Sequence, residues 1–259
     1  MIGISTSCFY PLETEKALLF LAQNGVRDVE IFFNAGCETQ GELFRTIQKI
    51  VRDHEMCVHA VHPYFTFAES NLLFSNYHRR FLDGVELYRR LAEACLGLSC
   101  DLLILHGEKE PFRISEELYI ERYGTLENTL FESGVRLTQE NVVRFRSQNP
   151  ELLAHMRRDL GDRFRMTFDV KQAVRCGLDP LTLAAEFADS IVHVHLSDHG
   201  EEGDCLLPGS GVFPFDRLFS VLRKADFRGD CVVELYRSAF AEPSMLLESY
   251  KNLQKFAKK

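Results

Sequence analysis

The 259-residue sequence contains no tryptophan, no Cys-x-x-Cys pair, no apolar run near 18 residues, and no cluster of lysine and arginine beyond short pairs. Its eight cysteines stand singly, which favours reduced thiols in a cytoplasmic protein over a disulfide framework. The absence of a long apolar run argues against a membrane-spanning helix. A formal net charge of −8 without a basic cluster argues against a general nucleic-acid binder.

The sequence does have the composition of a globular protein, with 46% hydrophobic residues, 26% charged residues and 21 phenylalanines to fill a core. Short β-like runs alternate with longer segments of helical period from one end of the chain to the other. The expected strands lie near residues 2–6, 28–32, 56–62, 101–106, 135–140, 164–169, 191–196 and 231–235. The expected helices include residues 13–24, 41–54, 77–96, 115–132 and 150–160.

Strict alternation of strands and helices predicts a parallel sheet with right-handed crossovers. Eight such units match an α/β protein with a single-domain (β/α)8 TIM barrel that spans residues 1–259. The alternative is a doubly wound open sheet, which usually has a glycine-rich turn after its first strand. Here that turn reads Ser5-Thr-Ser-Cys-Phe-Tyr-Pro11 and contains no glycine, which favours the barrel.

Four polar side chains close four of the expected strands: Glu140, Asp169, His195 and Glu234. In a barrel, the carboxyl ends of the strands meet at one mouth, so these residues would converge. Carboxylates and imidazoles beside apolar strands need compensation, and one divalent ion would compensate all four. Two Glu, one Asp and one His suit Mn²⁺ or Mg²⁺, with Co²⁺ and Zn²⁺ as alternatives.

Other polar residues occupy equivalent positions on earlier strands. His62 and His106 each close a strand, and either could contact a substrate or bind a second ion; we favour substrate contact. His193 shares a strand face with His195 but lies one layer deeper, where a core role is expected. Glu30 closes the second strand and either orients His62 or forms a structural ion pair.

Three loops could border this mouth. Residues 197–211 form the longest expected loop, whose four glycines either belong to a lid or only satisfy turns. The phenylalanine-rich segments 63–67 and 212–215 either close the pocket or form a contact between the subunits of a homo-oligomer. The sequence leaves both questions open.

The order and spacing of these pieces resemble the xylose-isomerase-like TIM barrels, a superfamily of sugar isomerases and epimerases that also includes the endonuclease IV DNA-repair enzymes. The resemblance covers the whole chain. It is carried by His62-Pro, His106-Gly, Glu140-Asn, Asp169 with Gly177-Leu-Asp, His195-Leu-Ser-Asp198, Pro208-Gly-Ser-Gly211 and Glu234. It implies a metal-dependent enzyme, and these motifs are more specific for the superfamily than for the reaction.

Within the superfamily, the ketohexose 3-epimerase type binds one metal ion through Glu, Asp, His and Glu. The matching residues here are Glu140, Asp169, His195 and Glu234. The endonuclease IV type uses three zinc ions and has a His at the position where this chain has Gln172. It also has an Asp-x-His in the loop after strand seven, where residues 203–207 of this chain contain no His. The resemblance therefore favours one ion.

The resemblance thus implies an isomerase or epimerase that acts on a small-molecule sugar or sugar phosphate by proton abstraction next to a carbonyl. It would use one divalent ion, most simply Mn²⁺. Glu140 and Glu234 are the expected catalytic residues and would exchange the proton from opposite sides of the substrate carbon. The expected substrate-binding residues are His62, His106, Gln172 and Arg237. Alternatives are a zinc phosphodiesterase acting on abasic DNA, a dehydratase of a polyol or keto acid, and a barrel that only binds a ligand.

Overall fold

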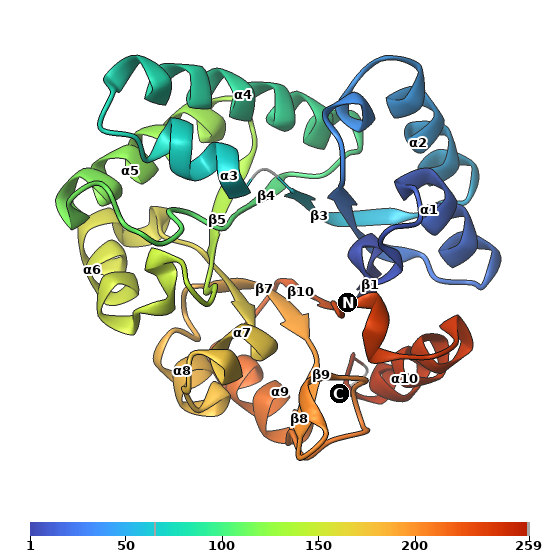
Figure 1. Cartoon of the computed structure of the whole chain (residues 1–259). Coiled ribbons are helices and arrows are strands. Elements are labelled where there is room, and N and C mark those ends of the chain that lie inside the picture. The colour runs from blue at the N-terminus through green and yellow to red at the C-terminus, as the bar shows by residue number, and fades with distance from the viewer. Residues whose placement is uncertain (65, 258–259) are drawn as a thin grey trace.

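The eight predicted strands close into one parallel barrel in the computed structural model, which describes residues 1–64 and 66–257 (Figure 1). Around the barrel, the order is β1-β10-β7-β6-β5-β4-β3-β2. The strands are β1 (Ile2–Ser5), β2 (Asp28–Phe33), β3 (Cys57–Pro63), β4 (Leu102–Leu105), β5 (Arg136–Glu140), β6 (Met166–Asp169), β7 (Ile191–Leu196) and β10 (Asp230–Val233). The predicted single-domain TIM barrel is confirmed, and the strand ends agree with the sequence to within two residues.

The helices form a ring around the barrel (Figure 1). They are α1 (Thr14–Gln23), α2 (Gly41–Asp53), α3 (Thr66–Ala68), α4 (His78–Gly97), α5 (Glu116–Glu132), α6 (Pro150–Leu160), α7 (Val170–Arg175), α8 (Pro180–Glu186), α9 (Phe215–Lys224) and α10 (Pro243–Ala257). The five predicted helices correspond to α1, α2, α4, α5 and α6. None of the described helices is long and apolar enough to cross a membrane.

Local sequence explains where several of these elements begin. The Ser115 hydroxyl accepts a hydrogen bond from Leu118 N at the start of α5. The Asn149 side-chain oxygen likewise accepts a hydrogen bond from Glu151 N at the start of α6, whose first residue is Pro150. The barrel strands are buried on both faces, and all four residues of β4 are buried, which is why it reads as the continuous apolar run Leu-Leu-Ile-Leu.

The segment after β7 differs from the long loop that the sequence predicted, because it contains an antiparallel hairpin. The hairpin strands are β8 (Asp198–Gly200) and β9 (Gly203–Leu206). The Asp198 carboxylate fastens the segment by accepting four backbone N–H groups at 2.8–3.0 Å, from His199, Gly209, Gly211 and Phe213. None of residues 197–211 is among the described residues that line the cavity beside the predicted ligands.

The two phenylalanine-rich segments have different outcomes. In segment 212–215, Phe213 and Phe215 are buried with ring centroids 4.9 Å apart, and Phe215 also packs near Phe256 of α10. These two phenylalanines are therefore core residues, and neither closes the pocket. In segment 63–67, Phe65 lies outside the described residues.

A charged cluster closes the amino end of the barrel. His59 on β3 lies between Asp28 and Asp230, with nitrogen–oxygen distances of 2.7 and 2.8 Å. Strands β3 and β10 are not neighbours in the barrel, so the second contact reaches across two intervening strands. The carboxyl end of the same barrel carries the residues that the sequence singled out.

Candidate metal centre

The four predicted metal ligands converge at the carboxyl end of the barrel. Glu140 and Asp169 are the last residues of β5 and β6, His195 lies near the end of β7, and Glu234 directly follows β10. All four side chains are buried. His195 Nδ1 lies 3.3 Å from Glu140 Oε1, 3.5 Å from Asp169 Oδ2 and 3.2 Å from Glu234 Oε2. One nitrogen and three carboxylate oxygens from four strands therefore surround one point.

These four atoms fit a divalent ion. His195 Nδ1 and Asp169 Oδ2 are buried and take part in no hydrogen bond, although the Lys171 ammonium lies 3.2 Å from that oxygen. Adjacent ligands of an octahedral ion lie about 3.0–3.3 Å apart when the ion–ligand distance is about 2.1–2.3 Å. The observed spacings need only a slight contraction to reach that range. A hard, mainly oxygen donor set with one imidazole matches the chemistry of Mn²⁺ and Mg²⁺.

Glu30 supports the ligand cluster from inside the barrel. Its side chain is fully buried, and Oε2 lies 3.0 Å from Nε2 of both His193 and His195, while Oε1 accepts the Ser5 hydroxyl at 2.8 Å. Burial alone would raise the pKa of Glu30, but His195 and His193 outweigh it and hold the pKa well below its ordinary value. A charged Glu30 accepts a hydrogen bond from Nε2 of His195, and this contact orients the ring so that Nδ1 faces the other predicted ligands.

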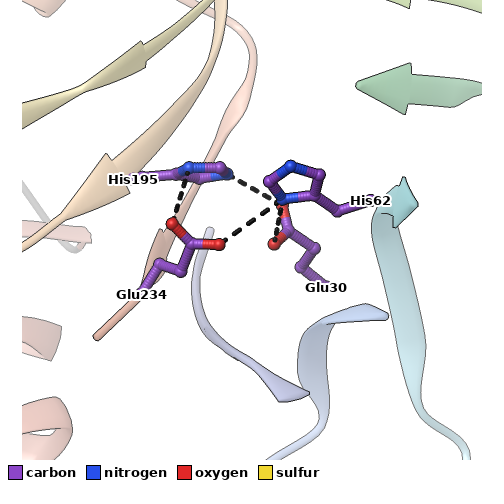
Figure 2. A group of neighbouring side chains, drawn as sticks. All are labelled: Glu30, His62, His195 and Glu234. Carbon is purple, nitrogen blue, oxygen red and sulfur yellow. Dashed lines mark hydrogen bonds and ion pairs between the residues drawn. The ribbon is translucent and has the colours of Figure 1, made fainter. Parts of the chain in front are cut away.

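The sequence left open whether Glu30 orients His62 or forms a structural ion pair, and its distances to the histidines bear on that choice. Figure 2 shows Glu30 and Glu234 beside the rings of His62 and His195, which lie next to each other. Glu30 contacts His62 Nδ1 at 3.6 Å, a longer distance than to either histidine of β7. It therefore orients His195 more directly than His62.

His62 and His106 form a second buried group. Their Nε2 atoms are 2.8 Å apart, so one imidazole donates a hydrogen bond to the other. Glu140 Oε2 lies 3.5 Å from the first nitrogen and 3.7 Å from the second and has no hydrogen-bond partner. These three residues also have the spacing of ligands to an ion. Behind them, the buried Glu69 contacts His106 Nδ1 at 3.4 Å.

Lys171 is a member of the site that sequence reasoning missed. Its ammonium lies 3.2 Å from Asp169 Oδ2 and 3.1 Å from Glu234 Oε2, and the residue is only 3% exposed. Burial alone would lower the pKa of Lys171, but Asp169 and Glu234 raise it well above its ordinary value. The available signal was the Asp-x-Lys spacing at the start of α7, two residues beyond a predicted ligand.

A cavity of about 570 Å³ opens beside the cluster. Its polar lining consists of Ser7, Asn34, His62, His106, Glu140, Lys171, Gln172 and Glu234, and its remaining walls are Tyr10, Phe32, Tyr64, Leu235 and Tyr236. Three of the four predicted substrate-binding residues, His62, His106 and Gln172, thus border the cavity. Their roles remain predictions.

The fourth predicted substrate-binding residue, Arg237, lies elsewhere. Its guanidinium donates to the carbonyl oxygens of Phe240 at 2.6 Å and Ala241 at 3.2 Å, and Arg237 is absent from the described cavity wall. Gln172 is held by its own contact, because its side-chain oxygen accepts Val143 N at 3.2 Å.

A family model described as Xylose isomerase-like TIM barrel matches residues 18–256. This chain belongs to the xylose isomerase-like TIM barrel family. An uncharacterized protein of Mycobacterium leprae (strain TN) is 24% identical over 276 residues, which cover 96% of this chain and 94% of that protein. Inosose dehydratase of Bacillus cereus (strain AH820) is 28% identical over 130 residues, or 43% of this chain and 40% of that enzyme.

Among solved structures, a crystal structure of a D-tagatose 3-epimerase-like protein matches with a TM-score of 0.81 and 18% identity, covering 99% of this chain and 97% of that one. At this identity the likeness shows the fold alone. The buried cluster of Glu, Asp and His is consistent with a divalent-metal site typical of the xylose isomerase-like family.

Proposed function

We propose that this protein is an isomerase or epimerase of a ketose-like sugar that uses one divalent ion. The observation that carries the proposal is the position of Glu140 and Glu234, which belong to the ligand cluster and also border the cavity. A carboxylate beside a substrate carbon can remove a proton from it, and a second carboxylate can return one. Return to the same carbon gives epimerisation, and return to the adjacent carbon gives isomerisation.

When bound, the divalent ion would supply the positive charge that stabilises negative charge developing on a carbonyl oxygen. The protein would supply the proton transfers. Lys171 contacts Oε2 of Glu234, whereas Oε1 lies 3.4 Å from both the Ser7 hydroxyl at the cavity wall and His62 Nδ1. The rings of His62 and His106 border the same space and would contact the substrate. A hydrogen bond from either Nε2 to a substrate oxygen would replace the one that joins the two histidines.

The charges of the cavity favour an unphosphorylated substrate. Lys171 is the one lysine or arginine among its described lining residues, and it already contacts two carboxylates. Arg146 lies in the loop after β5, but its guanidinium already forms an ion pair with Glu108 at 2.7 Å. A phosphate group is usually held by several cationic side chains, and Lys171 is the one such side chain in the described cavity wall.

A dehydratase of a polyol or keto acid is the second candidate. The partial match to an inosose dehydratase favours it, and its first step would be the same proton abstraction. The proton for a departing hydroxyl would be the hydrogen that joins His62 and His106. A zinc phosphodiesterase is the third candidate, because His62, His106 and Glu140 have the spacing of ligands for a second ion.

One experiment separates these candidates. Metal-free protein is titrated with Mn²⁺ and with Zn²⁺, and the loaded protein is incubated with ketopentoses and ketohexoses in D₂O while NMR follows deuterium uptake beside the carbonyl. We expect one ion per chain and uptake without loss of water. An unsaturated product would support the dehydratase, and two ions per chain with cleavage of an abasic oligonucleotide would support the phosphodiesterase.

Variants connect the result to the site. Glu234→Gln should abolish deuterium uptake and weaken ion binding, whereas Glu110→Gln, which changes an exposed glutamate outside the cavity wall, should alter neither. Full ion binding and full uptake by Glu234→Gln would contradict the assignment of Glu234.

A further inference from the structure

We propose that Lys171 is a positioning residue that acts as a built-in counter-cation of the metal site: it holds Asp169 and Glu234 in place before the ion binds, and it weakens the ion's affinity. This inference rests on the proposed ligand set of Glu140, Asp169, His195 and Glu234.

The first argument is that Lys171 and the ion would share the same oxygen atoms. The Lys171 ammonium lies 3.2 Å from Asp169 Oδ2 and 3.1 Å from Glu234 Oε2. These two oxygens also face His195 Nδ1, at 3.5 and 3.2 Å. An ion bound between the histidine and the carboxylates would therefore contact two atoms that Lys171 already holds.

The second argument concerns the position of the Asp169 carboxylate. Asp169 is the N-cap residue of α7, and its Oδ1 accepts a hydrogen bond from the backbone N–H of Gln172 at 2.9 Å. That hydrogen bond leaves Oδ2 as the oxygen for Lys171 and for an ion. Because Lys171 lies in the first turn of α7, the same helix start fixes both the carboxylate and the ammonium. The ring of Tyr236, 5.1 Å from the Lys171 ammonium, supports the cation from another side.

The third argument is electrostatic. Three carboxylates gathered in a buried cluster repel one another, and a buried charge without a partner is strongly unfavourable. Lys171 reduces that repulsion in the metal-free protein, so the ligands are arranged before the ion arrives. Once the ion is bound, two positive centres share two oxygens, and their repulsion lowers the affinity. Removing the lysine charge should therefore destabilise the metal-free protein and tighten ion binding.

The test uses the full chain with Lys171→Met, Lys171→Gln and Lys171→Arg, each freed of metal by chelation. Isothermal titration with Mn²⁺ gives the affinity, and thermal unfolding with and without Mn²⁺ gives the stability. We expect Lys171→Met and Lys171→Gln to unfold at lower temperature without metal, to bind Mn²⁺ at least tenfold more tightly, and to gain more stability from it than the wild type. Lys171→Arg should stay within threefold of the wild-type affinity.

The matched control is Lys109→Met, which removes an exposed lysine that follows another strand at the same end of the barrel. It should change neither measurement. Unchanged or weaker Mn²⁺ binding by both neutral Lys171 variants would overturn the inference and leave the lysine a purely structural role. A wild type that binds no ion at all would overturn the metal site itself, and this inference with it.

Discussion

Glu30→Gln tests whether the charge beneath the ligand cluster determines how well the site binds an ion. The glutamate accepts hydrogen bonds from the Ser5 hydroxyl and from Nε2 of His193 and of His195, at 2.8, 3.0 and 3.0 Å. A glutamine of the same shape can turn its carbonyl oxygen to the two imidazoles and its amide toward Ser5. The substitution therefore removes the charge and keeps most of the geometry.

The expected magnitude follows from those two imidazole contacts. A hydrogen bond to a charged group is worth about 1.5–3 kcal/mol and a neutral one about 0.5–1.5 kcal/mol. Losing the charge at two contacts should therefore lower the free energy of unfolding by about 2 kcal/mol. Partners that orient a metal-binding histidine typically change metal affinity by about 10- to 100-fold, so Mn²⁺ binding should weaken at least tenfold.

The assay is urea unfolding of the metal-free protein together with isothermal titration of Mn²⁺. Glu127→Gln is the matched control, because Glu127 is also buried and pairs with Arg165 at 2.8 Å on the outside of the barrel. It should lower stability without changing Mn²⁺ affinity. If Glu30→Gln binds Mn²⁺ within threefold of the wild type, the charge of Glu30 does not control the orientation of His195, and the reasoning fails.

Two further predictions concern parts of the fold away from the ligands. Burial would lower the pKa of His59, but Asp230 and Asp28 raise it to about 9. His59 and the N-terminal ammonium together lower the pKa of Asp230 to about 2 against the effect of burial. The contribution of His59 to the free energy of unfolding is complete below its unfolded pKa of about 6.5 and disappears as pH rises through 9. The contribution of Asp230 is complete above its unfolded pKa of about 4 and disappears as pH falls through 2. In urea unfolding, His59→Gln should therefore lose the most stability relative to the wild type, about 2 kcal/mol, between pH 4 and 6.5, and little at pH 10. A loss of stability that does not depend on pH would contradict the ion pairs. Gly211→Ala places a Cβ 2.2 Å from His199 O, so it should lower the unfolding temperature and speed proteolysis within residues 198–211. Gly200→Ala is the control, because its Cβ would come no nearer than 3.7 Å to Gly211 Cα; an equal effect of the two substitutions would argue against the close approach.

The barrel and the convergence of the four predicted ligands could be foreseen because both depend on local patterns. Each buried strand is a short apolar run, and each predicted ligand stands at the end of one of them, as Glu140 does after Arg136-Leu-Thr-Gln. Parallel closure then brings these ends together without any knowledge of side-chain packing. No long-range contact had to be known in advance.

Other contacts of the site could not be predicted, because they depend on strand register and on turns. The pairing of β2 with β3 shifts between Val29 and Glu30, and such a shift cannot be read from either strand alone. The role of Lys171 depends on a helix that begins immediately after β6, which turns its side chain back onto Asp169. Arg237 turns instead toward two carbonyl groups of its own loop, which removes it from the cavity that its position after β10 suggested.

Glu140 is the residue at which the question of mechanism becomes most specific. One of its oxygens faces His195 Nδ1 at 3.3 Å, and the other faces the His62–His106 pair at 3.5 and 3.7 Å. Because those two histidines are 2.8 Å apart, the hydrogen between them satisfies the pair itself, and Oε2 of Glu140 receives no hydrogen bond. A buried carboxylate oxygen without a donor, at the border of the cavity, is either a proton acceptor or a ligand of a second ion. In the one-ion enzyme that we propose it is the acceptor, so Glu140→Gln should lose deuterium uptake even where high Mn²⁺ restores occupancy of the site. Uptake restored by Mn²⁺ alone would remove Glu140 from the proton transfer.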